Sequence, residues 1–310
     1  MQKISDSNCT SRLYCVAGHL FRIRLPEDSL LWNRLGQYDP FEVKPEPAVD
    51  PVAETPGHKV LFEFELTDGM PQVEKKPFHI SEPQDGFTTI NLYKTESGWL
   101  FEFTMPSGHY AEMLASYNFS HARFCPHTTN SLAVVPLMNN ALMLLYSFAS
   151  CPYNTLEIHA SVVSNTGQAY LFLGESGAGK STHSRQWLEN IPDSELMNDD
   201  NPVVRILDDG TVMAYGSPWS GKTPCYRNVS APAGAFVSIR QCKENKATAM
   251  NLFEAYATLY SSSSGLKGNT GFADLIHPTL ERIATTVPFI YLDCRPDKEA
   301  AEVCRKAVCR

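Results

Sequence analysis

The sequence predicts a mixed α/β protein made of two parts. The first half is rich in aromatic and β-branched residues in partly alternating runs, a pattern typical of strands. From Cys151 onward, short apolar runs alternate with helical segments, an order that places helices over a sheet. At roughly 150 residues per domain, the 310 residues suggest about two domains. We therefore expect a β-rich domain at residues 1–130, a helical connector at 131–154 and an α/β domain at 155–310.

The composition excludes a largely disordered chain and argues against a nucleic-acid binder. Hydrophobic residues make up 43% of the chain and charged residues 19%, which gives ample material for a packed core. Lys and Arg number 26 against 34 Asp and Glu, so the net charge is −8 and the chain lacks the basic surplus of a nucleic-acid binder. A local basic pocket for a phosphorylated ligand remains compatible with this balance.

The N-terminus, the apolar runs and the cysteines predict a cytoplasmic protein without a membrane partner. Residues 1–10 are polar and lack the apolar core of a secretory signal. The longest apolar run, near residues 141–149, is shorter than the roughly 20 residues that cross a bilayer. The nine cysteines are odd in number, scattered and free of a C-x-x-C pair, which is typical of reduced thiols in a cytosol.

The elements of the N-terminal half are expected in the following order. Runs with strand composition occupy residues 14–25, 60–66, 88–93 and 99–104. Gly86, Gly98 and Gly108 stand where turns between strands are expected. Five prolines among acidic residues predict a loop or an extended insertion at 38–57. The apolar segment 131–149 predicts a mostly buried helix.

In the C-terminal half, short strands and helices alternate. Strands are expected at residues 156–163, 169–173, 195–197, 203–207, 212–214, 235–239 and 289–292. Helices are expected at residues 180–188, 251–260 and 273–283, and from near Asp297 onward. A polar stretch rich in serine and glycine predicts a loop at 261–271, between two of these helices.

The sharpest motif matches the phosphate-loop pattern G-x-x-x-x-G-K-S/T, and it lies between a predicted strand and a predicted helix. Its residues are Gly174, Glu175, Ser176, Gly177, Ala178, Gly179, Lys180, Ser181 and Thr182. Glycines let backbone N–H groups converge on phosphate oxygens, and the helix N-terminus adds a fixed positive end. In this template Lys180 bridges the terminal phosphates and the Ser181 hydroxyl binds Mg²⁺. The motif therefore predicts ATP and Mg²⁺ binding.

A second segment, residues 216–223 (GSPWSGKT), satisfies the same pattern. Its context argues against a second nucleotide loop, because Pro224 and the residues after it do not continue as a helix and Pro218 removes a backbone donor. Two interpretations stay open for this segment. Either it presents Lys222 or backbone donors to the transferred phosphate or the acceptor, or it is an ordinary surface turn.

Phosphoryl transfer also requires a carboxylate for Mg²⁺ and often a base for the attacking hydroxyl. Asp199 and Asp200 follow a short predicted strand soon after the phosphate-loop helix. Adjacent residues of an extended segment face opposite sides, so the two carboxylates have separate roles unless the strand has ended there. Asp-Asp is also ordinary turn chemistry.

Two further features stay undecided on the residues alone, and a metal site is not expected at a third. His159 lies in a strand that we expect beside the phosphate-loop strand, where it is either a satisfied core histidine or a group that tunes a carboxylate or contacts phosphate. Arg185 is either a phosphate contact or a solvated charge. The cluster of His121, Cys125 and His127 has the ligand types of a metal site but none of the usual zinc spacings.

These residues carry a family resemblance. The run IHASVVSNTGQAYLFLGESGAGKST and the following NDD resemble the catalytic domain of HPr kinase/phosphorylase, a P-loop kinase whose fold is shared with phosphoenolpyruvate carboxykinase. The resemblance covers about residues 155–310. The resemblance is strongest to the HPr-kinase-related proteins, which include kinases found beside modified-peptide biosynthesis genes. The segments GSPWSGK and CRPDKEAAE also resemble that group. The family's E-I-R-G-L-G-type stretch is absent, which argues against HPr as the acceptor and against the reverse, phosphorolytic reaction. The N-terminal half does not match the usual N-terminal domain of the family.

The resemblance implies transfer of the γ-phosphoryl group of ATP to a serine hydroxyl, with Mg²⁺. It makes Lys180 and Ser181 the residues that hold phosphate and metal, places the base in the pair Asp199–Asp200, and matches His159 to the family's upstream histidine. We expect Asp199 to be the base and Asp200 a metal ligand, with the reverse order as the alternative. The acceptor is an unidentified protein, peptide or small molecule with a hydroxyl group. Members of this family are often oligomers.

Two other functional classes stay open beside the kinase. One is a regulatory switch that binds ATP without a specific phosphoacceptor, and the other is an NTPase that transfers phosphate to water.

Overall fold

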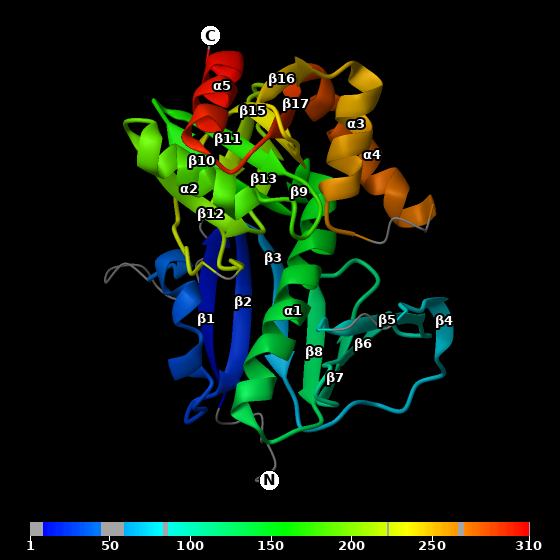
Figure 1. Cartoon of the computed structure of the whole chain (residues 1–310). Helices are drawn as coiled ribbons and strands as arrows, with labels where there is room; N and C mark the ends of the chain where they lie inside the picture. The colour runs from blue at the N-terminus through cyan, green and yellow to red at the C-terminus, as the bar shows by residue number, and fades with distance from the viewer. Residues whose placement is uncertain (1–8, 45–58, 83–85, 222, 266–269, 310) are drawn as a thin grey trace. The chain divides into compact units, whose positions relative to one another are not determined.

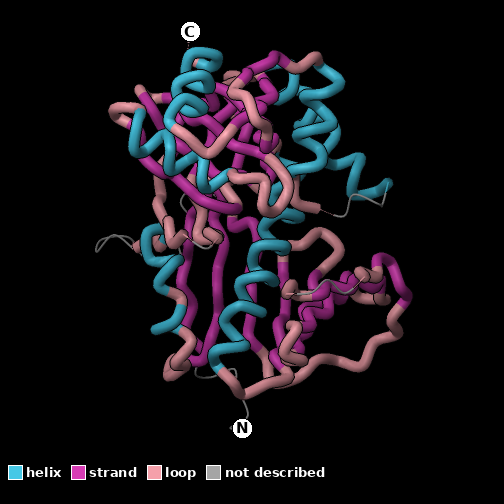
Figure 2. Tube along the Cα trace, in the orientation of Figure 1, coloured by secondary structure: helices cyan, strands magenta, loops and turns pink. Residues whose placement is uncertain are grey.

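The computed structural model describes residues 9–44, 59–82, 86–221, 223–265 and 270–309, and the chain forms two compact units, Met1–Ser150 and Cys151–Arg310 (Figure 1). Each unit contains one mixed β-sheet with helices packed on it (Figure 2). The mixed α/β class predicted from the sequence is therefore confirmed.

The first unit is built on an eight-stranded sheet with the order β1-β2-β3-β8-β7-β6-β5-β4. Its strands are β1 (Cys9–Val16), β2 (His19–Pro26), β3 (Val60–Leu66), β4 (Lys76–His79), β5 (Thr89–Lys94), β6 (Trp99–Thr104), β7 (Tyr110–Ala115) and β8 (His121–Pro126). Its helices are the short 3₁₀ helices η2 (Trp32–Arg34) and η3 (Gly36–Phe41) and the α-helix α1 (Ser131–Ser150). The pairs β2–β3 and β3–β8 are parallel, whereas the other neighbours are antiparallel.

The structure corrects several expectations for this unit. The single strand expected at 14–25 is a hairpin, because Ala17 and Gly18 adopt positive φ angles of 50° and 78° and reverse the chain. Strands β4, β7 and β8 were missed, and part of the loop expected at 38–57 belongs to η3. The part of that loop at 45–58 lies outside the described residues. Strands β3 and β6 have the expected bounds.

Helix α1 is the expected buried helix and is grouped with the first unit. It packs on β3, β7 and β8. By length and composition the segment Ser131–Tyr153 is long and apolar enough to cross a membrane, but 61% of its most apolar window is buried in the structure. Burial of this extent against a sheet is typical of a core helix, whose apolar surface is covered by strands.

The second unit is built on a nine-stranded sheet with the main order β12-β10-β11-β15-β14-β13-β9, in which β17 pairs with β15 and β16 pairs with β17. Its strands are β9 (Thr155–Glu157), β10 (Ala160–Asn165), β11 (Gln168–Leu173), β12 (Ser194–Asp200), β13 (Val203–Ile206), β14 (Val212–Tyr215), β15 (Ser230–Gln241), β16 (Lys246–Ala249) and β17 (Phe289–Cys294). Its helices are η4 (Cys151–Tyr153), α2 (Lys180–Asn190), α3 (Leu252–Ser262), α4 (Thr270–Thr286) and α5 (Lys298–Val308).

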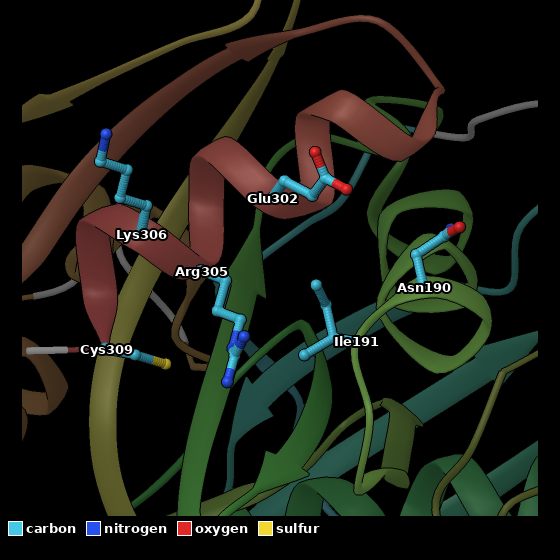
Figure 3. A pocket seen from close by; sticks show the side chains of 6 residues that line it. All are labelled: Asn190, Ile191, Glu302, Arg305, Lys306 and Cys309. Atoms are coloured by element: carbon cyan, nitrogen blue, oxygen red, sulfur yellow. The ribbon is translucent and has the colours of Figure 1, made fainter.

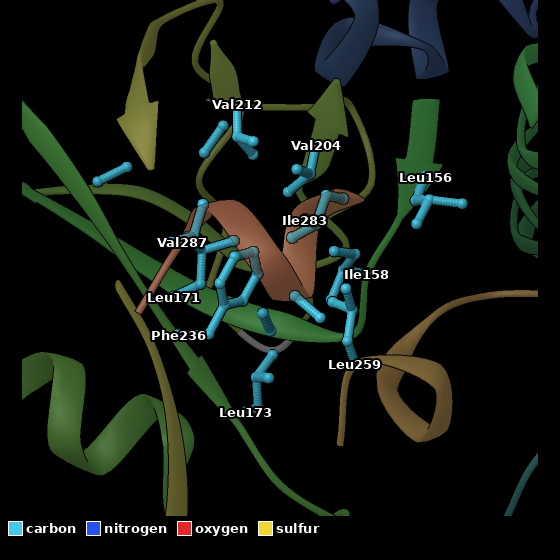
Figure 4. Packing of buried hydrophobic residues seen from close by; sticks show 14 of the residues in the cluster. Leu156, Ile158, Leu171, Leu173, Val204, Val212, Phe236, Leu259, Ile283 and Val287 are labelled. Atoms are coloured by element: carbon cyan, nitrogen blue, oxygen red, sulfur yellow. The ribbon is translucent and has the colours of Figure 1, made fainter. Parts of the chain in front are cut away.

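Two hydrophobic cores cover the faces of this sheet. Successive residues of β11 alternate between them, because side chains of a strand point to opposite faces. Leu171 packs with residues of α3 and α4 such as Leu259 and Ile283 (Figure 4). Phe172 packs instead with Trp187 of α2 and with residues of α5. The helices therefore lie on both faces, and α2 and α5 share one of them.

One correction matters for the site. The single strand expected at 156–163 is divided at Ile158 and His159 into β9, which pairs with β13, and β10, which pairs with β11 and β12. The backbone N–H of His159 donates instead to the carbonyl of Ser262, beyond the strand ladders. Strand β12 continues through Asp200, so the two aspartates are in a strand and not in a turn. Strand β16 was also missed.

Candidate functional site

The phosphate-loop motif forms an open nest of backbone donors at the start of α2. Strand β11 ends at Leu173, and Gly174, Gly177 and Gly179 have positive φ angles of 146°, 83° and 103°, conformations that strongly favour glycine. No atom lies within 4 Å of the position that a Cβ would occupy on Gly177 or Gly179. Gly179 is the N-cap of α2 and supplies no side-chain cap, so no capping side chain occupies the first N–H groups of the helix. This arrangement is suited to an anion.

Lys180, the first residue of α2, is held beside the phosphate loop by three hydrogen bonds. Its ammonium group donates to the carbonyls of Gly174 and Glu175 at 2.8 and 3.2 Å and to Nε2 of His159 at 2.9 Å. Burial lowers the pKa of Lys180, while the charges of Asp200 and Asp199 oppose that shift. The amino group is thus held by neutral acceptors beside two carboxylates, where a phosphate group would find a positioned donor.

His159 connects Lys180 to Asp200. Because Nε2 of His159 accepts from the lysine ammonium group, its proton is on Nδ1, which lies 3.2 Å from Oδ1 of Asp200. Asn201 donates to the other oxygen of this carboxylate at 2.8 Å. The structure therefore brings together three of the residues that the sequence singled out, and it places His159 at the site.

Asp199 faces the opposite side of β12, as strand alternation predicts. It is buried, and its Oδ1 accepts from the hydroxyl of Ser161 at 2.7 Å. Since that hydroxyl proton is committed to Asp199, the Ser161 oxygen accepts from Ser184 at 2.6 Å. Ser184 lies one turn after Ser181 on α2, so this chain of hydroxyl groups ties Asp199 to the helix face that carries Ser181. Sequence reasoning missed Ser161 and Ser184, because only spatial pairing distinguishes them from other serines.

The second G-x-x-x-x-G-K-T segment is not a phosphate loop. Residues 216–221 lie beside the end of β12, where Gly221 donates to the carbonyl of Asp199 at 3.3 Å, and residues 223–229 form no helix. A Cβ on Gly216 would lie 2.0 Å from the carbonyl oxygen of Arg227, so close backbone packing explains that glycine. The surface-turn interpretation is also wrong, because Ser217 and Trp219 are buried. Lys222 lies outside the described residues.

A buried carboxyl group near the site was not anticipated. Glu157 ends β9 and is 1% exposed. Burial raises its pKa well above the usual range, a hydrogen bond from Ser264 opposes that shift, and the charge of Asp200 adds to it. Its Oε2 has no hydrogen-bond partner in the described structure. A neutral carboxyl group explains this burial better than a carboxylate would.

The remaining sequence candidates lie elsewhere. Arg185 is exposed on α2. In the first unit His127 contacts Glu112 at 2.8 Å, His121 contacts Ser120 at 3.0 Å, and burial raises the pKa of the Cys125 thiol. Within the described ranges, no group of three or more His, Cys, Asp or Glu side chains is placed to hold a metal ion.

Two cavities flank α2. One, of about 390 Å³, adjoins its N-terminal end and includes Gly177 and Gly179 in its wall. The other, of about 420 Å³, lies at its C-terminal end beside α5 (Figure 3). The second is lined by Asn190, Ile191, Glu302, Arg305, Lys306 and Cys309. The two cavities are similar in volume, so volume does not distinguish them. Of the two, the first adjoins the phosphate-loop motif.

Comparison with known proteins gives only a distant similarity. No family model and no curated protein matches the chain. Among solved structures, the HPr(Ser) kinase/phosphatase from Coxiella burnetii aligns with 49% of this chain and 89% of its own, at 10% sequence identity and a TM-score of 0.30. At that score the alignment supports no detailed comparison of sites, so the function is argued from the residues of this chain.

Proposed function

We propose that this protein is an ATP- and Mg²⁺-dependent kinase that transfers the γ-phosphoryl group to a hydroxyl, namely a serine of a protein or peptide. The observation that carries the proposal is the open backbone nest at the start of α2, whose lysine is connected through His159 to a pair of aspartates. Phosphoryl transfer depends mainly on positioning and charge stabilisation, and these groups supply both. We also propose a phosphoenolpyruvate carboxykinase-like arrangement for the second unit.

The residues present are suited to Mg·ATP. Beyond adjacent residues of the chain, no protein atom lies within 4 Å of a Cβ built on Gly177 or Gly179, and the uncapped start of α2 supplies N–H groups for phosphate oxygens. In our proposal residues 174–182 hold the phosphates, and Ser181 with one aspartate holds Mg²⁺. When bound, the metal neutralises charge on the phosphate oxygens. Because phosphate oxygens and water complete the shell of Mg²⁺, few protein ligands are needed.

The geometry supports Asp199 as the metal ligand and Asp200 as the base, the reverse of our first expectation. Asp199 is buried and tied through Ser161 and Ser184 to the helix face that carries Ser181. The Asp200 side chain is 33% exposed, so an acceptor hydroxyl has access to it. His159, donating through Nδ1, orients the Asp200 carboxylate.

Within this proposal each side chain has one task. Lys180 leaves its carbonyl partners to contact a phosphate oxygen, where its charge offsets the charge that develops during transfer. His159 keeps Asp200 oriented while that carboxylate accepts the proton of the attacking hydroxyl. The buried hydroxyls of Ser161 and Ser184 keep Asp199 fixed.

The proposal is tested with γ-labelled ATP, Mg²⁺ and candidate serine peptides and sugars, using the wild type, Asp200→Asn and Asp199→Asn. We expect Asp200→Asn to bind ATP normally and to lose at least about 100-fold of the transfer rate, the scale of a lost general base. Asp199→Asn should need a higher Mg²⁺ concentration for the same rate. Normal ATP binding without transfer to any acceptor would favour a switch, and release of phosphate to water alone would favour an NTPase.

A further inference from the structure

The cavity at the N-terminal end of α2 extends away from the phosphate loop, over the ends of the neighbouring strands. It has a volume of about 390 Å³, at the lower end of the range for small-molecule sites. One wall is the loop itself, from Gly177 to Gly179, with Thr182 and His183 of α2. The other wall is formed by the residues at the ends of β15 and β17, which are Ile239, Gln241, Cys242, Cys294, Arg295 and Pro296.

The strand order explains why the cavity lies there. Strands β11, β15 and β17 are neighbouring and parallel, so their carboxyl ends meet at one edge of the sheet. Ligands of open α/β sheets bind in the crevice outside such ends. The end of β11 is the phosphate loop, so a ligand whose phosphates occupy that loop has its other end over β15 and β17. Gln241 donates to the carbonyl of Gly177 at 3.0 Å and joins the two walls.

The chemistry of the far wall is suited to a flat, uncharged ring. Ile239 and Cys294 are buried apolar groups, and Pro296 adds apolar surface. The guanidinium group of Arg295 is neutralised by Asp297 at 2.8 Å and Glu299 at 2.6 Å. Its charge is therefore already balanced, while its planar face remains able to stack on a heteroaromatic ring. A second phosphate group would find no uncompensated cation in this wall among the described residues.

We propose that this cavity binds the base and ribose of the nucleotide, with Arg295 stacking on the base. The inference rests on the proposed function, because it assumes that the phosphates occupy residues 174–182. It adds an assignment for the strand ends of β15 and β17, the second of which opens the CRPDKEAAE segment.

Cys242 gives a direct test that does not depend on activity. All nine cysteines lie in the described part of the chain, and Cys242 is the exposed one, whereas Cys309 is half-buried and lines the other cavity. The protein is treated with N-ethylmaleimide in the presence of Mg·ATP or of Mg²⁺ with inorganic tripolyphosphate, and each thiol is followed by mass spectrometry. We expect ATP to slow modification of Cys242 at least tenfold, tripolyphosphate less than twofold, and neither to change Cys309.

Calorimetric titration of the untreated protein with the same two ligands measures binding directly and separates this inference from the proposed function. Binding of ATP without protection of Cys242, or equal protection by tripolyphosphate, would overturn the base site and leave the phosphate site intact. Absence of any ATP binding would overturn both.

A pair of arginine variants provides the second measurement. Arg240 and Arg295 both have side chains that are 47% exposed and both pair with an aspartate, but only Arg295 lines the cavity. We expect Arg295→Ala to weaken ATP binding about tenfold and to change tripolyphosphate binding less than twofold. Arg240→Ala should leave both affinities unchanged. Equal ATP affinities for the two variants would contradict the stacking role, and unchanged tripolyphosphate binding shows that Arg295→Ala is folded.

Discussion

Two segments of this chain satisfy the same phosphate-loop pattern and have different structures. At residues 174–182 a buried strand leads into glycines with positive φ and then into α2. In the second segment, residues 216–221 lie beside the end of β12, and no helix follows at 223–229. In the first segment a Cβ on Gly177 or Gly179 would meet no atom of a distant residue within 4 Å, whereas Gly216 is in close contact with the backbone at Arg227.

The difference shows that glycine serves two unrelated purposes within one pattern. In the first segment it permits a left-handed backbone that turns N–H groups toward a ligand. In the second it permits two backbones to approach, which holds the segment against the end of β12. The second segment therefore supports the Asp199–Asp200 strand from the side and contributes to the site through the fold.

The largest expected effect is on the folding stability of Gly216→Ala. Its Cβ would lie 2.0 Å from the Arg227 carbonyl oxygen, and a backbone atom cannot move away as a flexible side chain does. We expect the free energy of unfolding to fall by about 3 kcal/mol or more, the upper range for an overpacked site. The measurement is urea denaturation at constant pH.

The matched variant is Gly179→Ala, at a position with φ of 103° and open space around the Cβ. We expect it to cost about 1–2 kcal/mol of stability through the left-handed backbone, and to weaken ATP binding as well. Equal losses of stability in the two variants would contradict the contrast between the two glycines.

Helix α2 follows the first segment, and its buried histidine should make folding sensitive to acid. His183 of α2 is buried against Phe172 and accepts from Trp187 Nε1 at 3.1 Å, and burial lowers its pKa from 6.5 to about 4. Below pH 6.5 the unfolded chain binds a proton that the folded chain does not. Stability should therefore fall by about 3 kcal/mol as the pH drops from 6.5 to 4.

This acid sensitivity is measured by urea unfolding at pH 7 and at pH 4.5. His183→Gln retains an acceptor for Trp187 and should lose most of the pH dependence in this window. His121→Gln, at an exposed position in the first unit, should keep it. If His183→Gln keeps the wild-type pH dependence, then His183 is not the group that titrates on unfolding.

The phosphate-loop conformation was predictable because its information is local. Glycines at fixed spacing, the apolar run of β11 before them and the helical run after them lie within about one strand and one helix of sequence. The predicted bounds of β3 and β6 were also right, because each is a short run rich in apolar and aromatic residues with partial alternation, followed by turn residues.

The missed features depend on pairings between distant residues. The division of one predicted strand into β9 and β10 follows from their pairing with β13 and β12, whose residues lie about 30 to 50 positions further along the chain. The hydrogen-bonded hydroxyls of Ser161 and Ser184 meet Asp199 only in the folded sheet. Glu157 gave no signal either, because an acidic residue in a strand is ordinarily read as exposed.

The lysines of the two segments should differ in their contribution to ATP binding. Lys180→Met keeps the apolar stem and removes the ammonium group that faces the phosphate nest. We expect ATP binding to weaken about 30-fold, which corresponds to about 2 kcal/mol for a lost charged hydrogen bond. Lys222→Ala should change ATP affinity less than twofold, because its segment forms no phosphate loop. Calorimetric titration with Mg·ATP measures both, and a larger loss for Lys222→Ala would reverse our assignment of the two segments.

The smallest expected effect is that of Ser217→Ala. It distinguishes a structural role of the second segment from nucleotide binding by that segment. Ser217 is fully buried, and its hydroxyl donates to the carbonyl of Asn201 at 2.6 Å and accepts from Asn198 at 3.1 Å. Ser217→Ala removes these bonds and should cost about 1 kcal/mol of stability, the usual net contribution of a buried hydrogen bond. ATP affinity should change less than twofold, because the segment does not contact the phosphates in our proposal.

Ser161→Ala is the matched variant, since it removes a similar buried hydroxyl but one that holds Asp199. It should raise the Mg²⁺ concentration needed for ATP binding, whereas Ser217→Ala should not. A tenfold loss of ATP affinity in Ser217→Ala without loss of stability would mean that the second segment binds the nucleotide directly.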